Sequence, residues 1–197
     1  MRTALLAAAV VAAHTAAAIQ LVERAGAEDR AQHARRHPAH HHHGLSAARQ
    51  VDLRHVVRRI RHLRKATWHW QVVLGDRRTP ASGTRLRRTS PAYRRWVLGL
   101  WKHRAAAVWT QARRPPHRRQ WLCIHRYEGA WSDPDAPYYG GLQMDLGFQQ
   151  AYGSYLLRTK GTADRWTPLE QMWVAERAHG THGFSPWPNT ARLCGLI

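Results

Sequence analysis

The chain is poor in acidic residues, and the few it has are unevenly placed. Only 12 of its 197 residues are acidic, against 31 lysines and arginines. Residues 1–119 carry 25 basic and five acidic residues, whereas residues 120–197 carry six basic and seven acidic residues. This distribution excludes a uniformly basic globule of the histone type. It predicts a neutral C-terminal module attached to a very basic N-terminal half.

The chain also lacks a long apolar run. The longest one, Ala4–Ala13, follows Arg2 and continues into small residues up to Ala18. A membrane-spanning helix needs about 20 apolar residues, whereas a positive start, a short apolar stretch and small residues are typical of a secretory signal. We interpret residues 1–20 as a signal segment and expect a secreted, cell-wall-associated protein. An uncleaved signal-anchor and an Ala-rich helix are the alternatives.

Cysteine is nearly absent, since Cys123 and Cys194 are the only two. In an exported protein an even pair of cysteines predicts one disulfide bond. The alternative is two unrelated buried thiols.

Residues 21–50 are polar and lack apolar periodicity, which predicts a flexible basic tether. The segment contains a histidine cluster, namely His33, His37 and His40–His43. Cysteine or carboxylate ligands at a defined spacing are missing, so we expect a solvated low-complexity segment rather than a metal site. We expect neither a metal ion nor an organic cofactor.

Residues 51–116 are predicted to form a helical hairpin with Arg, Lys and His side chains outside. In the first helix, apolar positions recur at alternating intervals of three and four, as in helices that pack together. These positions are Leu53, Val56, Ile60, Leu63, Thr67, Trp70 and Leu74. Gly75 is suited to end this helix.

The second helix of the predicted hairpin begins with Ser90 as its cap and Pro91 in its first turn. Its apolar stripe comprises Tyr93, Trp96, Val97, Leu100, Trp101 and Val108, and the Pro115-Pro116 pair ends it. Such a basic surface attracts polyanions without specificity. No nucleic-acid motif accompanies the charge. For an exported protein the nearest polyanion is the cell envelope, so anionic wall polymers are the expected partner. A solvated coiled-coil face is the alternative.

The most informative segment of the neutral module surrounds Glu128. Trp121 and Ile124 are spaced to lie on one side of a short helix, which Glu128 ends before Gly129. A carboxyl at a helix C-terminus lacks the support that the helix dipole gives to anions at the other end. Neighbouring aromatic rings would also partly desolvate it. Both effects favour the protonated form that a general acid needs.

An ordered series of motifs follows this glutamate. In chain order the series is Trp121, Glu128-Gly129, Trp131, Tyr138-Tyr139-Gly140-Gly141-Leu142-Gln143, Tyr152-Gly153, Glu170-Gln171, Val174-Ala175-Glu176-Arg177 and Trp187-Pro188. The segment Trp121–Cys194 thereby resembles the resuscitation-promoting-factor, or transglycosylase-like, domain of actinobacterial secreted proteins, a compact relative of lysozyme. We assign residues 119–197 to this domain. The cysteines differ from the usual pattern, since each is displaced by four residues. Four residues are about one helical turn, so the displaced cysteines stay on the same helix face. A disulfide between the same two elements is therefore still expected.

The resemblance implies a mainly α protein, in which a small lysozyme-like (α+β) catalytic domain follows the basic hairpin. It implies that Glu128 is the catalytic acid and that Gly141, Leu142 and Gln143 line a saccharide cleft. Aromatic rings stack on sugar faces, which adds Tyr127, Trp131, Tyr138 and Tyr139 as candidate binding residues. Core packing is the alternative for them, and it is what we expect for Trp121, Trp173 and Trp187.

The expected activity is cleavage of the β-1,4 bond between N-acetylmuramic acid and N-acetylglucosamine in peptidoglycan. Hydrolysis normally uses a second carboxylate. We expect Asp133 and Asp135 to form a turn, and Asp145 either to face the cleft or to cap a helix. Without a second carboxylate, the 6-hydroxyl of the sugar attacks C1 and forms a 1,6-anhydro product. The sequence leaves both routes open.

Glu170 is assigned to structure, because Thr167-Pro168-Leu169-Glu170 has the form of a capping box. Two other functions compete with the glycosidase. One is a wall-binding module without activity, and the other is a basic protein that binds polyanions or nucleic acid.

Overall fold

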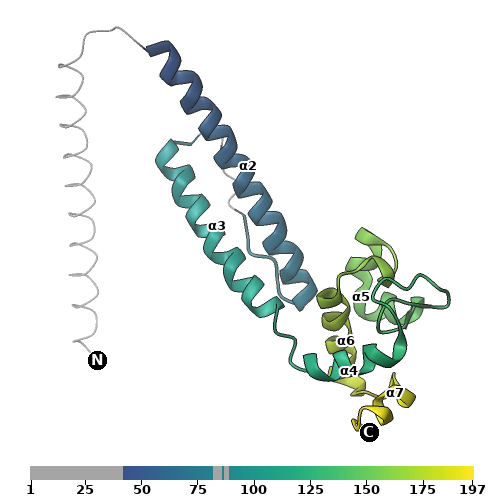
Figure 1. Cartoon of the computed structure of the whole chain (residues 1–197). Helices are drawn as coiled ribbons and strands as arrows, with labels where there is room; N and C mark the ends of the chain where they lie inside the picture. Colours follow the sequence, from purple (N-terminus) through teal and green to yellow (C-terminus); the bar gives the residue numbers. More distant parts are fainter. Residues whose placement is uncertain (1–41, 82–85, 87–88) are drawn as a thin grey trace, which may run out of the picture. The chain divides into compact units, whose positions relative to one another are not determined.

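The computed structural model describes residues 42–81, 86 and 89–197, with side chains described from residue 52 onward. The predicted signal segment and most of the predicted tether, including His33 and His37, lie outside the described residues. The chain divides into two units between Arg49 and Gln50. Apart from the start of the first described helix, the following description concerns the unit Gln50–Ile197. This unit is mainly helical (Figure 1), which confirms the predicted mainly α class.

Helix α2 spans His42–Leu74 and begins earlier than the hairpin boundary predicted at residue 51. The helix therefore extends into the segment predicted as a flexible tether. Extending an existing helix gains one backbone hydrogen bond for each residue that is fixed, and Ala47 and Ala48 are strong helix formers. At the other end, Gly75 has a φ of +84°, a conformation that suits glycine, and ends the helix as predicted.

Helix α3 spans Pro91–Ala112 and starts as predicted. The Ser90 hydroxyl accepts a hydrogen bond of 3.2 Å from the backbone N–H of Tyr93, and Pro91 occupies the first turn, where its missing N–H costs nothing. The loop before α3 is held to α2 through Thr79, whose carbonyl accepts a hydrogen bond of 2.8 Å from the indole N–H of Trp68.

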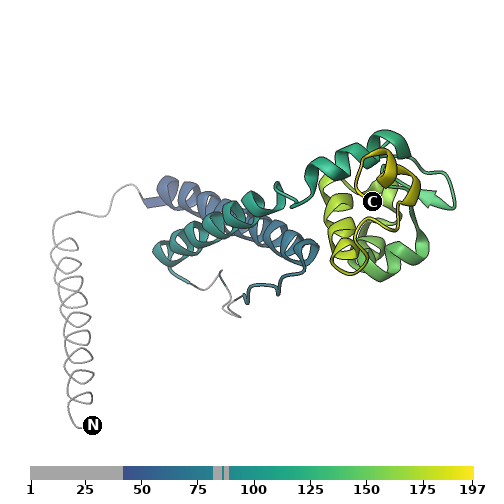
Figure 2. The same ribbon diagram turned by 90° about the horizontal axis from the view of Figure 1, so that it is seen from below.

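Helices α2 and α3 lie side by side and run in opposite directions (Figures 1 and 2), which confirms the predicted hairpin. Their buried contact joins Val56 and Ile60 of α2 to Val97 and Trp101 of α3. Trp96 was expected on this stripe but is 61% exposed. Adjacent residues of a helix point about 100° apart, so a stripe that buries Val97 leaves Trp96 outside.

The hairpin carries its basic side chains outside, as predicted. The exposed ones include Arg54, Arg58, Arg59, Arg61, Lys65, Arg95 and Lys102. Among the described helices, none combines the length and the apolar character required to cross a bilayer.

The C-terminal module contains α4 (Arg118–Glu128), α5 (Leu146–Lys160), α6 (Pro168–His182) and the short α7 (Pro188–Leu193). A 3₁₀ turn, η2 (Ala163–Arg165), connects α5 to α6. Between α4 and α5, strands β1 (Tyr138–Tyr139) and β2 (Met144–Asp145) pair antiparallel, with Tyr138 opposite Asp145. These elements form the green-to-yellow part of the chain in Figure 2.

The core of the module brings together aromatic residues from several elements. Trp121 of α4 is fully buried and Trp187, which precedes α7, is 5% exposed; their ring centroids are 5.0 Å apart. Trp173 of α6 is half-buried against the same cluster. The predicted core roles of these three tryptophans are therefore confirmed.

The module and the hairpin are joined where the hairpin helices end. The last carbonyls of a helix have no partner within the helix, and here α6 supplies donors for two of them. The Arg177 guanidinium donates to the carbonyl of Val73 at 2.7 Å, and the Trp173 indole donates to the carbonyl of Ala112 at 2.7 Å. The cationic guanidinium also complements the negative end of the α2 dipole.

Candidate active site

Glu128 is the last residue of α4 and is half-buried. Trp121 and Ile124 are fully buried on this helix, and residues separated by four or seven positions share a helix face. Glu128 therefore lies on the face that packs into the module. Gly129 ends the helix, with its backbone N–H donating to the carbonyl of His125. The predicted helix and the position of Glu128 at its end are confirmed.

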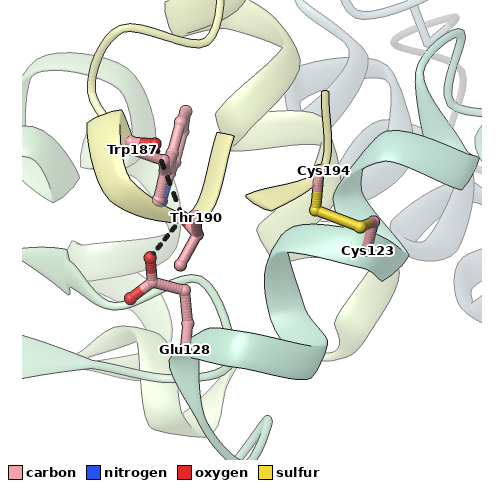
Figure 3. The surroundings of a disulfide bond; sticks show 5 residues. All are labelled: Cys123, Glu128, Trp187, Thr190 and Cys194. Carbon is pink, nitrogen blue, oxygen red and sulfur yellow. Dashed lines mark hydrogen bonds between the residues drawn. A yellow bond between two sulfur atoms is a disulfide. The ribbon is translucent and has the colours of Figure 1, made fainter. Parts of the chain in front are cut away.

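The carboxyl group of Glu128 is held by α7. The hydroxyl of Thr190, which is 7% exposed, donates a hydrogen bond of 2.7 Å to Oε1 of Glu128 (Figure 3). Within the described residues, no hydrogen bond to Oε2 is present, so this oxygen is available to another partner. Thr190 was not identified from the sequence.

A disulfide between Cys123 and Cys194, as predicted, joins the same two regions (Figure 3). Cys123 lies in α4 ahead of Glu128, and Cys194 directly follows α7. The covalent link and the hydrogen bond from Thr190 thus connect α4 to the α7 region at two places. This arrangement restricts where the carboxyl group of Glu128 can lie.

The loop after Glu128 folds back through Asp133 and Gln143. The side-chain amide of Gln143 donates to Oδ2 of Asp133 at 2.9 Å and to the carbonyl of Gly140 at 3.0 Å. Oδ1 of Asp133 accepts from the backbone N–H of Asp135, which confirms the expected turn. Gln143 has a φ of +46°, a left-handed conformation that costs a non-glycine residue about 1–2 kcal/mol. The loop geometry therefore overrides the local preference of Gln143.

The Gly140-Gly141 pair is required by close packing. A Cβ atom on Gly140 would lie 2.6 Å from Oε1 of the fully buried Gln171, whose amide holds the carbonyl of Trp131 at 2.8 Å. A Cβ atom on Gly141 would lie 2.6 Å from Nδ1 of His125 and 2.8 Å from the Trp131 ring. These contacts account for both glycines independently of any ligand.

The candidate stacking residues differ in exposure. Tyr127 and Tyr138 are each 51% exposed, so their rings are accessible to a ligand. Trp131 and Tyr139 are half-buried against the core cluster. The ring of Trp131 stacks on His125, with centroids 4.0 Å apart. Tyr127 lies near the end of α4, Trp131 lies in the turn that follows, and Tyr138 and Tyr139 form β1.

Two predicted cleft residues have clear structural roles. Asp145 caps α5, because its Oδ1 accepts a hydrogen bond of 2.6 Å from the backbone N–H of Phe148. Asp145 was expected either to face the cleft or to cap a helix, and the structure shows it as the helix cap. Leu142 is fully buried in the core, and its carbonyl accepts from the Trp187 indole at 2.7 Å. Its side chain cannot reach a ligand without opening the core.

Glu170 forms the predicted capping box with Thr167, but it also contacts a histidine and a lysine in ways that the sequence did not reveal. The side chain is 1% exposed and lies 2.6 Å from Nε2 of His69 in α2 and 2.7 Å from Nζ of Lys160. Burial alone raises the pKa of Glu170, but the hydrogen bonds from His69, Lys160 and the backbone of Thr167 lower it to about 2. The buried carboxylate is therefore ionised and ties α2 to the module.

A cavity of about 320 Å³ lies between α2 and α3. Its walls include Leu63, Thr67 and Trp70 from α2 and Lys102 and Trp109 from α3. None of the residues predicted for the glycan site lines this cavity. The spacing of apolar residues predicted the two helices, but it did not predict a cavity between them, which small residues such as Ala105 line.

A scan of the chain against known family models finds no match, and a search of curated proteins finds no relative.

Proposed function

We propose that this protein is a secreted peptidoglycan glycosidase with a lysozyme-like domain, in which Glu128 is the general acid. The observation that carries the proposal is the environment of its carboxyl group. Glu128 is half-buried at the end of α4, oriented through Oε1 by Thr190, and has Oε2 free of protein hydrogen bonds among the described residues. A positioned carboxyl with one unengaged oxygen is what proton transfer to a glycosidic oxygen requires.

The nearby carboxylates favour one of the two routes. Asp133 accepts hydrogen bonds at both of its oxygens within the loop, and Asp145 caps α5. Both carboxylates have structural hydrogen bonds, and Asp135 is exposed in the same turn. Hydrolysis normally uses a second carboxylate as nucleophile or as base for water. We therefore favour a lytic transglycosylase.

In the favoured route, protonated Glu128 gives its proton to the oxygen that leaves C1 of the muramic acid residue as the glycosidic bond breaks. The 6-hydroxyl of the same residue bonds to C1 and passes its proton to the Glu128 carboxylate. The products are a 1,6-anhydro end and a new 4-hydroxyl end, and Glu128 returns to its starting state. No cofactor takes part.

Binding of the glycan is assigned to the accessible rings near Glu128. Tyr127 and Tyr138 are exposed and Trp131 is half-buried, so each has ring surface for a sugar face. The disulfide fits an oxidising compartment outside the cytoplasm. The exposed Arg and Lys side chains of the hairpin would attach the enzyme to anionic wall polymers.

Digestion of purified peptidoglycan followed by mass spectrometry of the soluble fragments tests the reaction. A transglycosylase yields fragments ending in 1,6-anhydro-N-acetylmuramic acid, and a hydrolase yields fragments heavier by one water. A protein that sediments with peptidoglycan but releases neither fragment would be a binding module, and the glycosidase proposal would be wrong. If the protein binds peptidoglycan only at low salt and releases no fragments, the basic hairpin would be the functional part of the protein.

A further inference from the structure

A second cluster of chemically reactive side chains lies apart from Glu128, where the hairpin leads into the module. His117 precedes the first residue of α4, and Glu176 and His179 lie one turn apart on α6. One ligand atom from each of the three residues lies within 4.8 Å of the other two. The fold thus brings together two imidazoles and one carboxylate from segments about 60 residues apart in the sequence. No local sequence pattern indicates the contact between His117 and Glu176.

The carboxylate of Glu176 is fixed in place by donors from α4. Its Oε1 accepts the backbone N–H of His117 at 2.7 Å and the indole N–H of Trp121 at 2.8 Å. Its Oε2 lies 2.9 Å from Nδ1 of His117. Outer hydrogen bonds of this kind orient the ligands of metal sites. They leave Oε2 directed toward the imidazole of His117.

The ring of His179 has no hydrogen bond among the described residues, although its centroid lies 4.0 Å from that of His117. A neutral imidazole presents a nitrogen lone pair, which is the form that binds a metal ion. Here that lone pair lies close to a carboxylate and a second imidazole.

We propose that His117, Glu176 and His179 bind a divalent transition-metal ion, with Zn²⁺ as the best match. Two imidazoles and one carboxylate form a ligand set that zinc accepts, with a fourth position left for water. Bonds of about 2.0–2.2 Å require ligand atoms roughly 3.5 Å apart. The ligand atoms lie within 4.8 Å of one another, so binding requires them to move closer together.

Metal binding would replace the contact between Nδ1 of His117 and Oε2 of Glu176. The side chain of His117 is 35% exposed, which provides a path for the ion. The bound ion would clamp the start of α4 to α6 and so fix the junction between the hairpin and the module. This role is independent of the chemistry proposed for Glu128.

The test uses the full chain and Zn²⁺ alone as the probe. The histidine-rich N-terminal segment can itself bind zinc, so six histidines of that segment are first replaced by alanine; they are His33, His37, His40, His41, His42 and His43. Competition with a chromophoric chelator then measures stoichiometry and affinity. We expect one Zn²⁺ per chain in this background.

Two variants in that background test the ligands. His179→Phe keeps a ring against His117 and Phe184, and Glu176→Gln keeps an oxygen for the donors of α4. Loss of a hydrogen bond that only orients a ligand lowers metal affinity about 10–100-fold. Each of these variants removes a ligand, so we expect a larger loss of Zn²⁺ affinity. His182→Phe, on the same helix but outside the cluster, is the matched control and should retain the affinity.

A measurement without substitutions in the cluster covers the case in which these variants fail to fold. On addition of one equivalent of Zn²⁺, the NMR signals of the His117 and His179 ring protons should shift, and those of His182 should not. Absence of stoichiometric binding in the alanine background overturns the proposal, as do equal affinities of the ligand variants and the control. Because no sugar is involved, these outcomes are separate from the outcome for Glu128.

Discussion

The hydroxyl of Thr190 donates a hydrogen bond of 2.7 Å to Oε1 of Glu128. We expect Thr190→Val, which keeps the shape but removes the donor, to lower glycan cleavage roughly tenfold, equivalent to about 1.4 kcal/mol. Thr190 acts as a positioning residue, so Thr190→Ser should recover most of the rate. Initial rates of fragment release from purified peptidoglycan measure both variants. Equal rates for Thr190→Val and the unmodified protein would show that the hydrogen bond has no role in cleavage.

The disulfide should contribute strongly to stability, because it closes a loop with a sequence separation of 71 residues. We expect the double substitution Cys123→Ala/Cys194→Ala to lower the free energy of unfolding by about 4 kcal/mol. Urea denaturation followed by tryptophan fluorescence measures the change. A loss below about 1 kcal/mol would show that the α7 region is held in place mainly by its noncovalent contacts.

The packing around Gly141 predicts a steric effect. In Gly141→Ala, the added Cβ would lie 2.6 Å from Nδ1 of His125, and we expect a loss of about 1–3 kcal/mol of stability from overpacking. Gly180→Ala is the matched control, since no atom lies within 4 Å of its Cβ position in α6. The control should be stabilised by up to about 1 kcal/mol, because alanine favours the helix. Similar thermal melting shifts for the two variants would contradict the packing.

The sequence predicted those features that depend on neighbouring residues. Ser90 and Thr167 act as helix caps, Gly75 ends α2, and Cys123 pairs with Cys194, all as expected. Each follows from a local preference or from a pair with only one available partner. The position of Glu128 at a helix end was predictable for the same reason.

Contacts between distant segments could not be predicted from local patterns. Thr190 donates a hydrogen bond to Glu128, 62 residues away in the sequence. Glu170 contacts His69 of α2, although the capping box alone was enough to explain a glutamate at position 170. Local patterns assign a residue one role, whereas the folded chain can give it a second one. Trp96 illustrates the converse, since its apolar character suggested burial but helix geometry leaves it exposed.

The ion pairs of Glu170 predict acid sensitivity. Its pKa is lowered from an ordinary value of 4.5 to about 2, so its stabilising contribution is complete above about pH 4.5 and is lost as the pH falls toward 2. Glu170→Gln should cost on the order of 3 kcal/mol at neutral pH, because it removes the buried carboxylate that His69, Lys160 and Thr167 hold in its ionised form. It should also flatten the dependence of stability on pH between 4.5 and 2.

Urea unfolding at a series of pH values measures this effect, with Glu128→Gln as a control that retains the ion pairs of Glu170. An unchanged slope in Glu170→Gln would show that other carboxylates account for the acid sensitivity.

The most direct measurement is the rate at which Glu128→Gln releases soluble fragments from purified peptidoglycan, compared with the unmodified protein. Glutamine keeps the size of the side chain and an oxygen for Thr190 but has no proton of suitable acidity to give to the leaving oxygen. We expect release by the unmodified protein and a rate about 10²–10⁴-fold lower in the variant. Equal release by both proteins would contradict the assignment of Glu128 as the catalytic acid.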